Sequence, residues 1–319
     1  MFKRSLVLIA MVMVVACAKE NTTTSETTNT ATSDTAAATT TTAAGAATSS
    51  QGTQQIATGL QTPESVFYHA DQDVYLVSNI NGNPLDKDNN GYIAKVDPGT
   101  LAVTPWISGG KNGVTLNAPK GMAILKETLY VSDIDTVRMF DDKSGAPKGE
   151  VKIPGSTFLN DLVSDGTAVY VSDSGMKSGA GGNFEGTGTD AIWKIANNAA
   201  SKIASGKDLN RPNGLEMANG TLYVVTFGAN ELYSLQAGKK TGAVKLPKGS
   251  LDGLVHMPDG TFLVSSWESN SIFRGPANGP FQEVITGVTS PADIGYDTKR
   301  HLVLVPHFTE SKITIHPLQ

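Results

Sequence analysis

"RPNGLEMANGTLYVV", residues 211–225, joins a turn to a strand and is one of six related stretches that decide the fold. The turn is predicted by Pro212, Asn213 and Gly214. The strand is predicted by the alternation of β-branched and aromatic residues over 221–225. The same order recurs in "TPESVFYHADQDVYLVSN" (62–79), "APKGMAILKETLYVSD" (118–133), "FLNDLVSDGTAVYVSD" (158–173), "SLDGLVHMPDGTFLVS" (250–265) and "SPADIGYDTKRHLVLV" (290–305).

Aligned on their turns, the six stretches place one residue each at the same position, which we call the ring position. The ring residues are Glu64, Lys120, Asn160, Asn213, Asp252 and Ala292. Their spacings are 56, 40, 53, 39 and 40 residues, so the period is about forty, with extra length in the first and third units. Short strands repeated at this period are typical of a β-propeller. Since no segment has helical periodicity, the sequence predicts an all-β, six-bladed propeller over residues 54–319.

The two ends of this domain are expected to meet in one blade. In the first unit the strands are expected at 66–69, 74–77, 92–96 and 103–107. The sixth unit has segments for three strands and none for a fourth, whereas "QQIATGL" (54–60) precedes the first unit without a partner. Pairing 54–60 into the last blade would remove two exposed sheet edges, so we expect closure by the N-terminal strand.

The residues before the propeller have the composition of an export signal and a linker. Residues 1–16 join a basic start to an apolar run that is short for a membrane span, as in a signal peptide. The run ends before Cys17 in a pattern that resembles a bacterial lipobox, so Cys17 is the expected lipidation site; the alternative is an ordinary signal peptide with an incidental Cys. Residues 18–53, rich in Thr, Ala and Ser, bury too little apolar surface to fold and are expected to form a disordered tether.

Location and partners follow from these features. Ala18 after the Cys resembles lipoproteins sorted to the outer membrane of diderm bacteria, so we expect a lipid-anchored monomer in the bacterial cell envelope. Cys17 is the single Cys, so no intramolecular disulfide can form. The net charge of −5 and the lack of a basic cluster argue against a nucleic-acid partner.

Four ring residues carry oxygen donors, which makes the ring a candidate metal site. In a propeller the inner strand of each blade begins at one face of the channel, so side chains at the ring position point at one another. Carboxylate and amide oxygens are the ligands that Ca²⁺ and Mg²⁺ prefer, and two carboxylates match a 2+ charge. The competing explanation is that Asn and Asp simply favour turns before Gly.

The motifs "PESV", "LNDL", "PNGL" and "LDGL" resemble the metal-site motifs of the gluconolactonase, senescence marker protein and luciferin-regenerating enzyme family. They resemble those of paraoxonases and diisopropylfluorophosphatase more distantly, and the resemblance covers 54–319. It implies a divalent cation, with Ca²⁺ as first choice, held by Glu64, Asn160, Asn213 and Asp252, and hydrolysis of a lactone or related small-molecule ester. In some members the first Asn contacts substrate, so the role of Asn160 stays open. The alternative function is a lipid-anchored binding module with a structural metal.

Asp161 and Lys120 are candidate catalytic residues. Asp161 stands where paraoxonase-like enzymes have an Asn-Asp pair, and would activate water, attack as a nucleophile or only accept a hydrogen bond beside the site. Lys120 stands where paraoxonases carry a His. Three roles are possible for Lys120: a general base with a lowered pKa, an oxyanion donor, or a structural partner of Asp161 or Asp293. The structural partner is the first choice.

The second strands end at the same face as the ring, so Phe227, Trp267 and His307 are expected in the pocket wall. His307 is either a third catalytic candidate that titrates near neutral pH or a rim residue without a catalytic role.

Two insertions lie between second and third strands on that face. In "NGNPLDKDNNGYIAKVD" (81–97), the span from Asp86 to Asp97 nearly matches a twelve-residue Ca²⁺ loop, so a second Ca²⁺ site or a polar lid is expected. "SGMKSGAGGNFEGTGTD" (174–190) is expected to be a flexible flap. The absence of a Gly-x-Ser-x-Gly elbow argues against an α/β-hydrolase.

Overall fold

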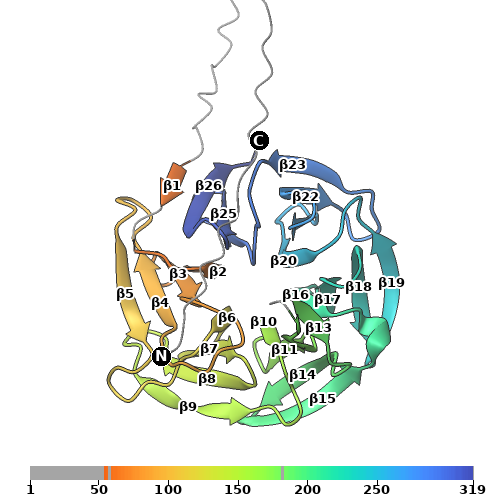
Figure 1. Cartoon of the computed structure of the whole chain (residues 1–319). Coiled ribbons are helices and arrows are strands. Elements are labelled where there is room, and N and C mark those ends of the chain that lie inside the picture. The colour runs from red at the N-terminus through yellow and green to blue at the C-terminus, as the bar shows by residue number, and fades with distance from the viewer. Residues whose placement is uncertain (1–53, 57–58, 181–182, 319) are drawn as a thin grey trace, which may run out of the picture. The chain divides into compact units, whose positions relative to one another are not determined.

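The computed structural model describes residues 54–56, 59–180 and 183–318. Within these ranges six four-stranded antiparallel sheets surround a central channel, which confirms the six-bladed propeller (Figure 1). The predicted signal peptide over 1–16, the lipidation site Cys17 and the tether over 18–53 lie outside the described residues. Among the described residues, no helix has the length and apolar character needed to cross a membrane.

Each blade runs from an inner strand at the channel to an outer strand at the rim. The inner strands are β2 (Pro63–His69), β6 (Pro119–Leu125), β10 (Leu159–Ser164), β16 (Pro212–Ala218), β20 (Leu251–His256) and β24 (Gly295–Asp297). The second strands are β3 (Val74–Asn79), β7 (Thr128–Asp133), β11 (Val169–Asp173), β17 (Thr221–Thr226), β21 (Phe262–Ser266) and β25 (Leu302–His307). The third strands are β4 (Tyr92–Val96), β8 (Thr136–Asp141), β14 (Ala191–Ala196), β18 (Glu231–Gln236), β22 (Ser271–Gly275) and β26 (Lys312–Pro317). The outer strands are β5 (Val103–Ser108), β9 (Pro147–Lys152), β15 (Ala199–Ser205), β19 (Lys239–Lys245), β23 (Gln282–Thr286) and β1 (Gln54–Ile56).

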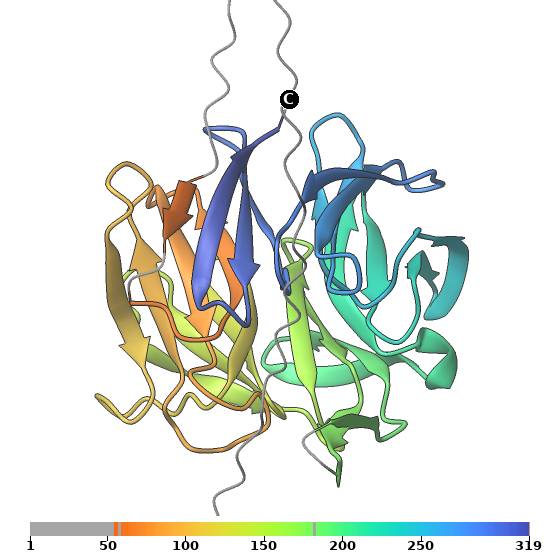
Figure 2. The ribbon, with the colours of Figure 1, turned by 45° about the horizontal axis from the view of Figure 1, so that its top comes forward.

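The sixth blade is completed by the N-terminal strand. β1 pairs antiparallel with β26, with Gln54 opposite Ile315 and Ile56 opposite Ile313. In Figures 1 and 2 the orange β1 therefore lies beside the blue strands of the last blade. The predicted N-terminal closure is confirmed.

The hydrophobic core is divided among the interfaces between neighbouring blades. Leu76 and Ile93 of the first blade pack with Leu129 and Val131 of the second, and all four are buried. Another apolar cluster joins the first blade to the sixth, so the interface that closes the ring is also hydrophobic. Because a fully buried aliphatic side chain contributes about 1.5–3 kcal/mol, these interfaces hold the ring of blades together.

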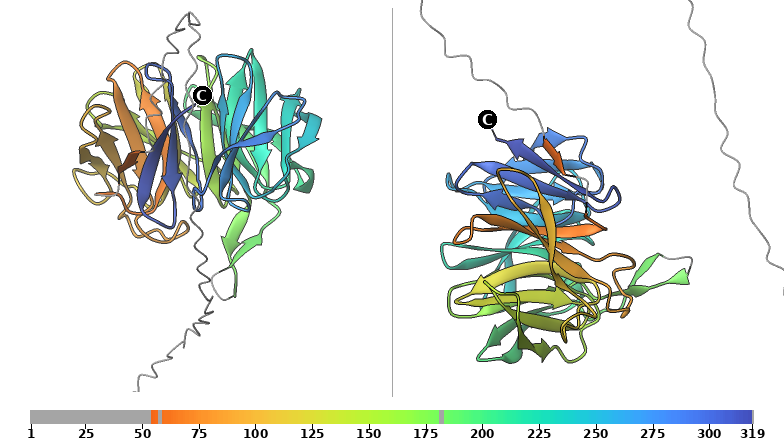
Figure 3. Two further views of the ribbon diagram at one scale, coloured as in Figure 1. Left: turned by 90° about the horizontal axis from the view of Figure 1, so that it is seen from above. Right: turned by 90° about the vertical axis from the view of Figure 1, so that its left-hand side faces the viewer.

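The insertion over 174–190, expected to be a flexible flap, contains a β-hairpin. β12 (Met176–Ser178) pairs with β13 (Phe184–Gly186), and this pair projects from one face of the propeller (Figure 3). The Phe184 ring contacts the Phe158 ring edge to face, with centroids 5.8 Å apart.

Of the two alternatives for residues 81–97, the position of β4 argues against the twelve-residue Ca²⁺ loop. β4 occupies residues 92–96 of the proposed loop, and five extended residues separate Asp97 from the other donors by roughly 16 Å. Asp97 Oδ1 instead accepts the backbone N–H groups of Gly99 at 2.9 Å and Thr100 at 2.7 Å, in the turn to β5. The Asp97 carboxylate therefore stabilises the turn between β4 and β5.

Candidate functional site

β-Bulges lie at the ring position in five of the six inner strands. In β10 the register to β11 shifts between Leu159 and Leu162, so Asn160 and Asp161 together oppose one residue, Ser172. Similar shifts span the ring position in β2, β6, β16 and β20. A bulge re-aims the side chains at which it occurs and leaves backbone groups unpaired, so it sets the channel geometry.

Serines of the second strands satisfy the backbone groups that the bulges leave free. Ser172 Oγ accepts the Asp161 N–H at 3.0 Å and donates to the Asn213 carbonyl at 2.8 Å. Ser265 does the same for the N–H of Gly253 at 2.7 Å and the carbonyl of Ala292 at 2.8 Å. Each serine thereby ties the bulge of its own blade to the ring position of the next. The sequence analysis missed these serines, although the recurring "VS" near the end of the second strands was a visible signal.

Close packing between blades explains the glycines that follow three ring residues. A Cβ on Gly214 would lie 2.2 Å from the Asp252 carbonyl oxygen, and one on Gly121 would lie 2.5 Å from the Asp161 Cα atom. Gly214 thus allows the backbone of the next blade to approach.

The ring residues with polar side chains are all buried, with exposed fractions of 1–5%. In the described part of the chain, five side-chain nitrogen or oxygen atoms are buried without a hydrogen-bond partner, and three belong to the ring. They are Glu64 Oε2, Asn213 Oδ1 and Asp252 Oδ1. A buried polar atom left without a partner costs about 1–3 kcal/mol, so three at equivalent positions fit a bound cation better than turn preference.

Hydrogen bonds on the opposite sides of these groups orient them. Asn213 Nδ2 donates to the Leu251 carbonyl at 3.2 Å, which leaves Oδ1 free. Asp252 Oδ2 accepts the indole N–H of Trp267 at 2.8 Å, which leaves the other oxygen free. Asn160 Nδ2 donates to Ser174 Oγ at 3.2 Å. Asn160, Asn213 and Asp252, three of the four proposed donors, are therefore held in place by protein contacts.

Burial raises the pKa of the ring carboxyls. The pKa of Glu64 is raised well above its usual range by burial and then by the charges of Asp252 and Asp293. Burial, with a further contribution from Asp293, raises the pKa of Asp252 to about 8. A divalent cation would reverse this preference for the neutral form, because it favours the carboxylates.

Amide oxygens would be needed for a cation at the ring. Across 59–180 and 183–318, no three His, Cys, Asp or Glu side chains gather closely enough to hold a metal ion. The set of Glu64, Asp252, Asn160 and Asn213 has only two carboxylates, so the two Asn residues must supply the remaining protein ligands.

Lys120 does not pair with Asp161 or Asp293, which corrects the role ranked first for it. Its Nζ donates to the carbonyls of Pro84 and Ala118, both at 3.1 Å, and lies 4.5 Å from the centre of the Phe158 ring. Burial lowers its pKa to about 8, although the charge of Glu64 acts in the opposite direction. A lowered pKa is the property that the general-base alternative for Lys120 requires.

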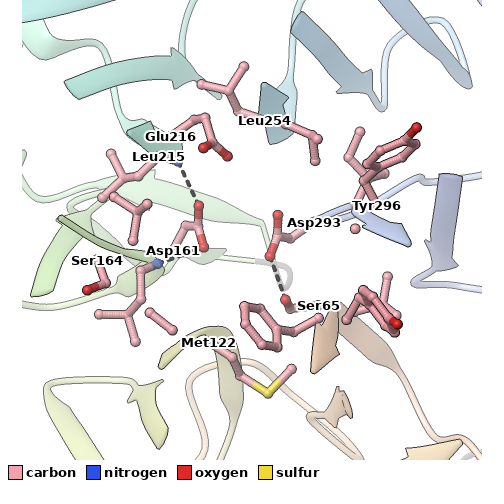
Figure 4. Close-up of a pocket in the computed structure, with 18 of the residues that line it drawn as sticks. Ser65, Met122, Asp161, Ser164, Leu215, Glu216, Leu254, Asp293 and Tyr296 are labelled. Carbon is pink, nitrogen blue, oxygen red and sulfur yellow. Dashed lines mark hydrogen bonds between the residues drawn. The ribbon is translucent and has the colours of Figure 1, made fainter. Parts of the chain in front are cut away.

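Asp161 lines a cavity in the channel beyond the ring. The cavity has a volume of about 360 Å³ and is bounded by the part of each inner strand that follows the ring position (Figure 4). The two carboxylate oxygens of Asp161 accept the N–H groups of Leu162 and Leu215, both at 2.6 Å. Burial, and then the charge of Asp293, raise the pKa of Asp161 well above its usual range.

Two further carboxyls share this cavity. Asp293 accepts the Ser65 hydroxyl at 2.5 Å, and burial raises its pKa to about 7. Burial also raises the pKa of Glu216 to about 8. The sequence analysis missed Glu216 and Ser65 and considered Asp293 only as a partner of Lys120. A carboxylate at a strand position that is uncharged in the other five repeats was the available signal for Glu216.

Phe227 and Trp267 lie beside the ring, but His307 does not contribute to it. Phe227 contacts Trp267 edge to face with centroids 5.9 Å apart, and Trp267 reaches Asp252. The imidazole nitrogens of His307 are hydrogen bonded to Glu310 and Thr314, both at 2.9 Å and both in the sixth blade. Burial lowers the pKa of His307, and its two nitrogens are occupied within the blade.

Comparison with known proteins supports the fold. No protein-family model matches the sequence, and no curated protein matches it. A solved gluconolactonase from Xanthomonas campestris is 14% identical and has a TM-score of 0.63, with 84% of this chain and 89% of that chain covered. A streptogramin B lyase structure is 12% identical with a TM-score of 0.60, covering 84% and 98% of the two chains. Virginiamycin B lyase from Staphylococcus aureus is 13% identical with a TM-score of 0.58, covering 84% and 99%. The resemblance to gluconolactonases first found in four motifs thus extends over the propeller fold, which lyases share.

Proposed function

We propose that this chain is a divalent-cation-dependent hydrolase of a lactone or related ester. The cation, with Ca²⁺ as first choice, would be held by Glu64, Asp252, Asn213 and Asn160. The observation that carries the proposal is the set of three buried oxygens without partners on Glu64, Asn213 and Asp252. When bound, a divalent cation supplies a Lewis acid that polarises an ester carbonyl, worth several kcal/mol of the barrier.

The residues around the ring would orient the ligands and handle the proton. Trp267 fixes the Asp252 carboxylate by its hydrogen bond. Asp161, adjacent to Asn160, is held by two backbone N–H groups, so its carboxylate has a fixed position from which to accept a proton from water or attack the substrate.

A binding module with a structural metal is the second candidate, and one observation favours it. The polar ring residues are only 1–5% exposed, and Phe158 and Trp267 contact Lys120 and Asp252. A structural cation needs no open coordination position, whereas a catalytic one must admit substrate.

Metal analysis and calcium titration of the purified full-length protein test the ring first. Asn213→Ala and Asp252→Ala should each weaken Ca²⁺ binding by about tenfold or more, because each removes a ligand oxygen. Asn278→Ala, at an exposed position, is the matched control and should bind Ca²⁺ like the parent. If the parent binds no divalent cation at micromolar to millimolar concentration, the ring oxygens have another role and the proposal fails.

A panel of lactones, esters and phosphotriesters, assayed with and without chelator, then separates the two functions. Turnover that is lost with chelator and in both ligand variants supports the hydrolase. Cation binding without turnover of any substrate supports the binding module. Mass analysis of the product distinguishes addition of water from elimination, the outcome that a lyase would produce.

A further inference from the structure

A pocket separate from the channel cavity is lined by two cationic side chains. It lies where the third and fourth blades meet, has a volume of about 520 Å³ and is lined by Lys207, Arg211 and Asp190 together with several glycines. Arg211 stands two residues before Asn213 at the start of β16, and Gly228 follows the end of β17. Since inner strands begin and second strands end at one face, this pocket opens on the ring side of the propeller.

The two cations of this pocket have no counter-ion among the described residues. Other cations nearby are paired: Lys240 Nζ lies 2.5 Å from Glu231, and Lys177 Nζ lies 3.7 Å from Glu185. Neither Arg211 nor Lys207 takes part in an ion pair or a side-chain hydrogen bond in this part of the chain. The carboxylate of Asp190 is 6% exposed, and its Oδ2 accepts the backbone N–H of Arg211 at 2.7 Å. The lining is therefore net positive in a chain whose net charge is −5.

The backbone around Arg211 is held in a conformation that most residues avoid. Asn210 and Arg211 have φ values of 57° and 54°, which place two consecutive residues other than glycine in the left-handed region. The Asp190 carboxylate fixes the N–H of Arg211, and the Phe227 N–H donates to its carbonyl at 2.9 Å. These hydrogen bonds fix the backbone from which the Arg211 side chain extends.

Glycines leave room along both cationic side chains. A Cβ on Gly228 would lie 3.1 Å from Arg211 Cγ, and one on Gly186 would lie 3.4 Å from Arg211 Nη2. A Cβ on Gly188 would lie 3.5 Å from Lys207 Cε. The pocket is thus shaped around two unpaired cations by the β12–β13 hairpin and the end of β17.

This pocket is connected to the ring through aromatic side chains. Phe227, whose N–H binds the Arg211 carbonyl, contacts the Trp267 ring, and Trp267 donates to Asp252. We propose that the pocket binds an anionic group, a carboxylate or a phosphate, on the small molecule recognised at the ring. The guanidinium of Arg211 would bind two oxygens of this group, and Lys207 would supply a second charge. The link to the ring rests on the proposed function, whereas the anion site does not.

Calorimetric titration of the full-length protein with inorganic phosphate tests the anion site without any assay of activity. Saturable millimolar binding is expected, and added NaCl should weaken it. Arg211→Gln should weaken it by about tenfold, Lys207→Gln by less, and Arg211→Lys should retain only part of the affinity because the forked geometry is lost. Lys111→Gln, which removes an exposed lysine in the connection between β5 and β6, is the charge-matched control and should bind like the parent.

The outcomes separate this inference from the proposed function. Phosphate binding that is absent in the parent, or equal in Arg211→Gln and the parent, overturns the anion site. If Arg211→Gln does not fold, Lys207→Gln decides in the same way. Where the parent hydrolyses esters, Arg211→Gln should raise KM for an ester bearing a free carboxylate and leave KM for its neutral methyl ester unchanged. Equal KM changes for the two substrates overturn the link to the ring. A parent without hydrolytic activity defeats the proposed function and leaves the phosphate result valid.

Discussion

Trp267 donates its indole N–H to Asp252 Oδ2 at 2.8 Å, while Asp252 Oδ1 is buried with no partner among the described residues. One oxygen of this carboxylate is therefore fixed by the protein, and the other is left to bind something else. In metal sites generally, removing a group that orients a metal ligand by a hydrogen bond lowers metal affinity by about 10–100-fold.

Trp267→Phe should lower Ca²⁺ affinity by about tenfold, because the Asp252 carboxylate loses its orienting hydrogen bond. Trp193→Phe is a suitable control, since the Trp193 Nε1 atom is buried without a hydrogen-bond partner. Calorimetric titration with CaCl₂ measures both variants. Equal losses in the two would show that indole packing, and not the bond to Asp252, affects the ring.

Lys120→Met should spare or strengthen Ca²⁺ binding. The substitution removes an ammonium group whose charge acts on Glu64 and keeps an unbranched side chain against Phe158. The same titration gives the answer. Loss of Ca²⁺ affinity in a folded Lys120→Met protein would mean that the lysine supports the ring in a way that its charge does not explain.

Deleting residues 18–60 should lower the melting temperature by roughly 5 °C or more, because β1 supplies the outer strand of the sixth blade. Deleting 18–53 alone keeps that strand and should leave the melting temperature unchanged. Differential scanning calorimetry compares the two deletions. If both melt like the parent, β1 contributes little to closure.

Acid should abolish the stability that Asp259 contributes. Hydrogen bonds from the Thr261 side chain at 2.6 Å and from the Thr261 N–H at 3.0 Å lower the pKa of Asp259 to about 2. An unfolded Asp has a pKa of about 3.9, so the contribution is present above that pH and is lost as the pH falls through about 2. Asp259→Ala should therefore melt below the parent at pH 7, with a difference that shrinks between pH 4 and pH 2. A difference that stays constant over this range would assign the loss to packing instead.

Cys17→Ser should release the protein from the membrane fraction, since Cys17 is the proposed lipid acceptor and the single Cys of the chain. Fractionation of cells that express the parent and the variant measures this. A Cys17→Ser protein that still sediments with membranes would disprove lipid anchoring through this residue.

Repetition in the sequence was sufficient to predict the architecture. Six turns at a period of about forty residues, each followed by strand-forming residues, specify six similar sheets, because each blade forms from residues close in sequence. The missing strand of the sixth unit and the unpaired segment over 54–60 also predicted the closure that β1 and β26 make. The same alignment grouped Glu64, Asn213 and Asp252, on which the structure leaves three buried oxygens free.

Contacts between blades decided what the repeats could not. A bulge opposite Ser172 places Asn160 and Asp161 together against one residue, contrary to the simple alternation of a strand. Lys120 binds the Pro84 carbonyl, which lies in a loop 36 residues earlier, and not the carboxylates expected from its place in the ring. His307 finds both partners inside its own blade. Hydrophobic periodicity predicts which face of a strand is buried. It does not predict which distant backbone group a polar side chain binds, and these long-range hydrogen bonds determine the chemistry of the channel.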